Sequence, residues 1–121
     1  MIVLTTKEVA RYRSQISEYE AALEALDAIE DCEGNLEDAA ITLALKLGME
    51  PSNSEIWLRD EAKRCRAIIC QQEFREDLLN KNITRVVGYL LEQEICPPVL
   101  AAPAVIYAVE TKIQKFCKPL D

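Results

Sequence analysis

The sequence predicts an all-α fold, and three observations support this prediction. Apolar residues recur at steps of three and four from Val9 to Leu26, which keeps them on one face of a helix. Capping residues and prolines divide the rest of the chain into segments of helical length. The 121 residues are 50% apolar with only three glycines, enough to bury one core. We therefore expect residues 1–121 to form a single compact bundle of about five or six helices.

The first helix is expected to be long and amphipathic. Thr5 and Glu8 have the spacing of a capping box at its start, and Gly34 suits its C-terminal cap. A second capping-box pattern begins at Ser17, so the segment reads either as one helix or as two helices joined there. Because the apolar stripe stays in phase across Ser17, we favour a continuous or mildly kinked helix. The stripe consists of Val9, Tyr12, Ile16, Tyr19, Leu23 and Leu26.

The second helix, over 36–47, is expected to be the buried centre of the bundle. Asn35 is a good N-cap, and the residues that follow leave almost no polar face. Gly48 and Pro51 mark its end. A third helix is expected over 55–72, with caps among residues 52–54 and a charged outer face.

The remaining helices follow from the same kinds of signal. The apolar residues within 74–79 either continue the third helix or form a short one that ends at a turn near Asn80. A further helix is expected over 83–94. The prolines at 97–98 break the chain, and Pro103 suits the first turn of a last helix.

The negative charge of the chain is concentrated in its first half. The net charge is −7, and residues 1–50 hold four Lys or Arg against eleven Asp or Glu, whereas residues 51–121 hold ten of each. Such a field repels nucleic acid and favours either solubility, as a purely solvated acidic face, which is the more common case, or a basic protein partner. The expected contact, with a protein partner or with a second copy in a homodimer, involves Tyr12, Tyr19, Glu20, Glu24 and Asp27.

The five cysteines show no CxxC spacing, and the chain opens without the features of a signal peptide. These observations predict a cytoplasmic protein whose cysteines are buried free thiols. The longest uncharged run, 95–109, is too short to span a membrane and contains three prolines. We therefore expect no membrane partner.

The absence of histidine excludes most catalytic chemistry. Histidine is the usual general base and a common metal ligand, and glycine-rich loops that hold phosphates are absent as well. The acidic turn 31–38 does not match a calcium loop, because placing Gly34 at the sixth position puts Ile29 and Ala40 at the first and twelfth. We expect a non-enzymatic binding protein without a cofactor or a metal.

A helix-turn-helix motif is the alternative basis for function. Ala44 and Gly48 have the spacing of that motif, and a continuous helix over 55–72 would place Arg59, Lys63 and Arg66 on one side, where they could contact DNA. The intervening turn is longer than the usual three or four residues, and acidic residues lie among the basic ones. Direct DNA binding is therefore the second hypothesis, after protein–protein contact.

The segment 25–40, ALDAIEDCEGNLEDAA, and the ending 116–121, FCKPLD, resemble a family of small all-helical cyanobacterial proteins. The biochemical activity of that family is unknown, and its suggested link is to transcriptional control of heterocyst differentiation. The resemblance implies a regulatory role without a catalytic motif.

Overall fold

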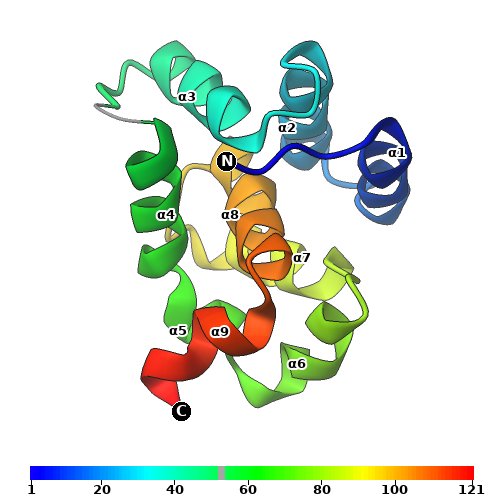
Figure 1. The fold of residues 1–121 in the computed structure, drawn as a ribbon, viewed down its shortest axis with the longest axis vertical. Coiled ribbons are helices and arrows are strands. Elements are labelled where there is room, and N and C mark those ends of the chain that lie inside the picture. The colour runs from blue at the N-terminus through cyan, green and yellow to red at the C-terminus, as the bar shows by residue number, and fades with distance from the viewer. Residues whose placement is uncertain (52–53) are drawn as a thin grey trace.

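The computed structural model describes residues 1–51 and 54–121, and it confirms the expected all-α class. This part of the chain contains nine α-helices rather than five or six, because several predicted helices are interrupted. The helices are α1 Thr6–Gln15, α2 Glu20–Asp31, α3 Leu36–Lys46, α4 Ser54–Arg64, α5 Arg66–Ile69, α6 Gln72–Leu79, α7 Thr84–Gln93, α8 Pro98–Glu110 and α9 Ile113–Cys117 (Figure 1). A 3-10 turn, Lys118–Leu120, follows α9. Of the caps predicted within 52–54, those at Ser52 and Asn53 lie outside the described residues.

The long N-terminal helix is two helices, so our preference for a continuous helix was wrong. α1 begins with the predicted capping box of Thr5 and Glu8 and ends at Gln15. There the Thr84 hydroxyl donates to the Gln15 carbonyl (2.9 Å), and the Gln15 side chain accepts from the backbone N–H of Ile83 (2.8 Å). Because these contacts come from another part of the chain, local sequence patterns did not show where the helix stops.

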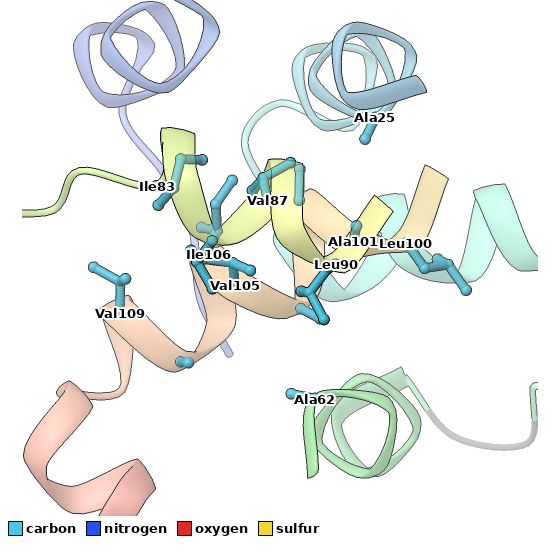
Figure 2. Close-up of a cluster of buried hydrophobic side chains, with 14 of the residues drawn as sticks. Ala25, Ala62, Ile83, Val87, Leu90, Leu100, Ala101, Val105, Ile106 and Val109 are labelled. Carbon is cyan, nitrogen blue, oxygen red and sulfur yellow. The ribbon is translucent and has the colours of Figure 1, made fainter. Parts of the chain in front are cut away.

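The buried centre of the bundle is α8, not the predicted second helix. α3 buries one face, yet Leu45 and Leu47 at its C-terminal end are exposed. α8 begins at Pro98 with Pro97 as its N-cap, earlier than predicted, and keeps Pro103 inside the helix. It packs against α2, α3, α4, α7 and α9, which surround it (Figure 1). Figure 2 shows side chains of α2, α4 and α7 gathered around those of α8.

The predicted third helix over 55–72 is broken into α4 and α5, and the residues after it form the separate short helix α6, one of the two alternatives we left open. Cys65 separates α4 from α5, and Cys70 ends α5. Cys70 forms a disulfide with Cys117, the last residue of α9, with 5.6 Å between their Cα atoms. The expectation that all cysteines are free thiols is therefore wrong for this pair. Cys32, Cys65 and Cys96 are free, and the last two are buried.

Within residues 1–51 and 54–121, no helix combines the length and the apolar composition needed to cross a bilayer.

Candidate functional site: a cationic pocket between α4 and α9

Basic side chains from three helices line one pocket, although the chain as a whole is acidic. The pocket has a volume of about 280 Å³. α4 contributes two of the basic residues, α5 contributes one and α9 contributes one, and the end of α8 completes the wall. We call this the cationic pocket, and its lining residues are Arg59, Lys63, Arg66, Tyr107, Thr111, Lys115 and Phe116.

Arg66 is held in place by an aromatic ring. Its guanidinium carbon lies 4.9 Å from the centroid of the Phe116 ring, a cation–π contact between α5 and α9. The buried Nε atom of Arg66 has no hydrogen-bond partner within the described part of the chain. A buried donor without an acceptor costs about 1–3 kcal/mol. The pocket therefore contains a guanidinium group that packs on the Phe116 ring and whose Nε–H has no acceptor among the described residues.

The other three cations of the pocket are weakly neutralised. Arg59 lies 3.5 Å from Asp60, and both of these side chains are exposed. Exposed pairs of this kind contribute little, about 0–1 kcal/mol. Lys63 and Lys115 form no ion pair with any described residue. The pocket thus carries a positive charge that an anionic group could balance.

Tyr107 and Thr111 form the α8 side of the pocket. Burial raises the pKa of the Tyr107 phenol, while the positive charge of Arg59 opposes this shift. The phenol therefore stays protonated at neutral pH and can donate a hydrogen bond. The Thr111 hydroxyl donates to the carbonyl of Tyr107 (2.9 Å), so it shapes the wall rather than offering a donor. The rings of Tyr107 and Phe116 meet edge to face, with centroids 6.4 Å apart.

Covalent and ionic links hold the two walls of the pocket together. The Cys70–Cys117 disulfide joins the end of α5 to the end of α9, four residues after Arg66 and one residue after Phe116. Arg75 reinforces the same region: its Nε donates to the Cys70 carbonyl (2.8 Å), and its Nη2 pairs with Asp121 (2.8 Å). The relative positions of Arg66 and Phe116 therefore depend on contacts outside the pocket itself.

The residues predicted to bind DNA come together, but not in the way predicted. Arg59, Lys63 and Arg66 all line the cationic pocket. However, Arg66 belongs to α5, beyond the break at Cys65, so the premise of one continuous basic helix face was wrong. The three side chains instead border a hollow that α8 and α9 close on the other side.

The residues predicted to bind a protein partner divide into two groups. Tyr12 is a core residue, only 1% exposed, and its hydroxyl donates to Glu110 (2.6 Å), so it is not available on the surface. Tyr19 is half-buried, with its hydroxyl against Gly88. The side chains of Glu20, Glu24 and Asp27 on α2 remain exposed, and Asp27 pairs with Arg13 (2.7 Å).

Sequence reasoning missed four of the seven residues that line the pocket. Tyr107, Thr111, Lys115 and Phe116 come from the last two helices, more than 40 residues after Arg66. The repeated basic residues near the C-terminus were a signal, since Lys112, Lys115 and Lys118 recur at steps of three. No local pattern, however, indicates that this segment lines the same pocket as α4.

The described lining of the pocket offers cations, one phenol and an aromatic ring, and its one hydroxyl already donates to the Tyr107 carbonyl. A carboxylate or an imidazole, the usual general bases, is not among these lining residues. Nowhere in residues 1–51 and 54–121 do three His, Cys, Asp or Glu side chains gather as metal ligands.

Comparisons with protein-family models, with curated proteins and with solved structures found no match to this chain, so the resemblance to the cyanobacterial family stays a prediction.

Proposed function

We propose that this chain is a non-enzymatic regulatory binding protein, and that the cationic pocket is its binding site for a compact anionic ligand. One observation carries the proposal: Arg59, Lys63, Arg66 and Lys115 converge on one pocket in a chain whose net charge is −7. Like charges repel one another, so such a cluster is stabilised when an anion occupies it. The regulatory setting, control of transcription in cell differentiation, rests on the sequence resemblance alone.

The shape of the site favours a compact anion over duplex DNA. A recognition helix has to enter a major groove about 12 Å wide, which requires basic side chains on a protruding helix. Here the Arg66 guanidinium packs over the Phe116 ring of α9, and the basic residues line a pocket together with residues of α8 and α9. Direct DNA binding stays the alternative proposal, and it uses the same three residues Arg59, Lys63 and Arg66.

Calorimetric titration with inorganic pyrophosphate tests the proposed function. Replacing both Lys63 and Lys115 with Gln removes two positive charges from the pocket, and we expect the Kd to rise at least tenfold, or about 1.4 kcal/mol. The matched control replaces Lys7 and Lys46 with Gln, which removes the same charge from exposed lysines outside the pocket. The control Kd should change less than twofold.

Two outcomes would contradict this proposal. If pyrophosphate does not bind, or if both double variants weaken binding equally, the cationic pocket is not the site. If a 20-base-pair duplex binds more tightly than pyrophosphate at 150 mM salt, and the Lys63/Lys115 variant abolishes this binding, the DNA alternative is correct.

A protein partner at α2 is a second candidate. The observation that favours it is the exposure of Glu20, Glu24 and Asp27 along one helix. Carboxylates placed this way steer the association of a basic partner. Reversing the charge of these three residues should slow association with that partner and flatten its salt dependence, and unchanged kinetics would count against the candidate.

The cytoplasmic location of the protein stays a prediction as well. A disulfide such as Cys70–Cys117 is uncommon in reducing compartments, so this bond does not favour that prediction.

A further inference from the structure

Two free cysteines meet in the core, at the junctions of four helices. Cys65 separates α4 from α5, and Cys96 lies in the connection between α7 and α8. Because α4 packs against α8 and α5 packs against α7, these two segments are brought together. The thiols of Cys65 and Cys96 hydrogen-bond to each other, and neither belongs to a disulfide. The fold therefore holds two reduced sulfur atoms side by side.

The two sulfur atoms differ in their access to solvent. Cys65 is 0% exposed, whereas Cys96 is 8% exposed. Cys96 also lines a pocket of about 390 Å³ that is formed by residues 94–98. A small reagent can therefore reach Cys96 from this pocket, while Cys65 is enclosed behind it in the core.

The hydrogen bond between the thiols favours a state in which the pair shares one proton. It lowers the pKa of Cys65, although burial and the Glu61 carboxylate oppose this effect. The same hydrogen bond, together with burial, raises the pKa of Cys96, so the second proton is held firmly. In such a coupled pair the remaining proton can move across the hydrogen bond. Thiolate charge is then available at Cys96, on the accessible side.

We propose that Cys65 and Cys96 form a peroxide-reactive dithiol site, in which Cys96 reacts first and Cys65 completes a second disulfide. A thiolate next to a second thiol is the arrangement in which a sulfenic acid condenses to a disulfide. The inference does not rest on the proposed function, because neither cysteine lines the cationic pocket.

Hydrogen peroxide is the oxidant in this reaction and is reduced by two electrons. The Cys96 sulfur attacks one peroxide oxygen and the O–O bond breaks, so that Cys96 becomes a sulfenic acid. The leaving hydroxide takes the shared proton from Cys65 and becomes water. The Cys65 thiolate then attacks the Cys96 sulfur, the S–O bond breaks, hydroxide leaves and the disulfide forms.

Peptide mapping of the full chain after treatment with equimolar hydrogen peroxide tests the inference. The protein is alkylated in denaturant and digested with trypsin without reduction. Arg66 lies between Cys65 and Cys70, so trypsin separates the new bond from the Cys70–Cys117 disulfide. We expect a crosslinked peptide that joins Cys65 to Cys96.

Cys32 is the internal control of this experiment. It is more exposed than the other two free cysteines, so access alone predicts that it is oxidised first. Its recorded side-chain contact is with the Thr42 hydroxyl (3.9 Å), rather than with a thiol. We expect Cys32 to remain alkylated while the pair oxidises at least tenfold faster.

Single variants assign the order of the two steps. Cys65→Ser removes the resolving thiol, so a sulfenic acid should accumulate on Cys96, and dimedone should trap at least fivefold more of it than in the wild type. Cys96→Ser should slow the oxidation of Cys65 at least tenfold relative to the wild-type pair. Cys32→Ser is the matched substitution, and the yield of the Cys65–Cys96 disulfide should stay within twofold.

Three results would overturn the proposal. One is a wild-type map in which Cys65 and Cys96 stay alkylated after Cys32 has been oxidised. Another is a folded Cys65→Ser variant without a dimedone adduct on Cys96. The third is an unchanged rate of Cys65 oxidation in Cys96→Ser. If either variant fails to fold, the wild-type map decides the question, and its result is independent of whether the cationic pocket binds an anion.

Discussion

Among single residues, Tyr12 connects the two ends of the chain. Its ring is buried in the core, and its hydroxyl donates to Glu110 of α8 across a sequence separation of 98 residues. Lys81 lies 3.5 Å from the same carboxylate. Tyr12 was expected on a partner surface because the apolar stripe alone does not say what the stripe packs against. Its contribution is instead to stability.

We expect Tyr12→Phe to lower the free energy of unfolding by about 2 kcal/mol, because a buried hydrogen bond to a charged group is lost. Urea unfolding at neutral pH measures this change. Tyr89→Phe is the control, since the Tyr89 hydroxyl makes no hydrogen bond to any described residue. Equal losses in the two variants would show that the bond to Glu110 contributes nothing.

Tyr12 also predicts how stability depends on alkaline pH. Burial, followed by the hydrogen bond to Glu110, raises the pKa of Tyr12 above its ordinary value. A tyrosine whose folded pKa is raised contributes stability that is complete below the unfolded pKa of about 10 and is lost as the pH rises further. The free energy of unfolding should therefore fall as the pH rises above about 10, and less steeply in Tyr12→Phe. Parallel curves for the two proteins would contradict this.

Two glycines with similar backbone angles allow a matched comparison. Gly34 has φ +87° and Gly48 has φ +80°. A Cβ atom on Gly34 would collide with the backbone carbonyl of Leu4, whereas a Cβ on Gly48 would meet no atom within 4 Å. Gly48→Ala should cost about 1–2 kcal/mol for the left-handed conformation alone.

Gly34→Ala should cost at least about 2 kcal/mol more than Gly48→Ala, because overpacking adds to the same backbone strain. The collision also threatens the hydrogen bond from the Leu4 N–H to the Gly34 carbonyl (2.8 Å). Thermal unfolding of both variants measures the difference. Indistinguishable losses would show that the N-terminal segment moves aside at little cost.

Among the elements, three features that depend on neighbouring residues in the sequence lie where the sequence predicted them. The capping box of α1, the Asn35 cap of α3 and the whole of α7 fall within about a residue of their predicted positions. The misses come from contacts between distant segments. α1 stops where Thr84 and Ile83 bond to Gln15, and α5 stops where Cys70 bonds to Cys117.

α9 is a five-residue helix, and the Cys70–Cys117 disulfide links its last residue to the residue that ends α5. The bond closes a loop with a sequence separation of 47 residues. On the chain-entropy account, a loop of this size stabilises the folded state by about 4 kcal/mol. We expect reduction, or replacement of both cysteines by Ser, to lower stability by about 2–4 kcal/mol.

The same change should raise the Kd for pyrophosphate about tenfold, because Phe116 and Lys115 are then less firmly held beside Arg66. Urea unfolding and titration with and without a dithiol reductant measure both effects, and alkylation followed by mass measurement confirms that the bond is broken. Cys32→Ser, which removes a free thiol, is the control. Unchanged affinity in the reduced protein would show that the pocket does not need the disulfide.

For the whole molecule, the charge distribution was readable from the sequence, but the location of the site was not. The acidic first half and the basic residues of 59–66 were evident, and the structure places three of the latter, Arg59, Lys63 and Arg66, in a single pocket. The pocket also needs α8 and α9: α8 packs against both α4 and α9, an arrangement that the order of the helices along the chain does not show. Four segments of the chain line the pocket, so the pocket forms only when the bundle is folded.

The central claim is that this acidic protein binds a compact anion in the cationic pocket. The most direct test follows the backbone amide NMR signals of the ¹⁵N-labelled full chain during titration with pyrophosphate at constant ionic strength. We predict saturable shifts that centre on Arg59, Lys63, Arg66, Thr111 and Lys115. Shifts that never saturate, or that centre on basic residues elsewhere such as Lys81 and Arg85, would contradict the claim.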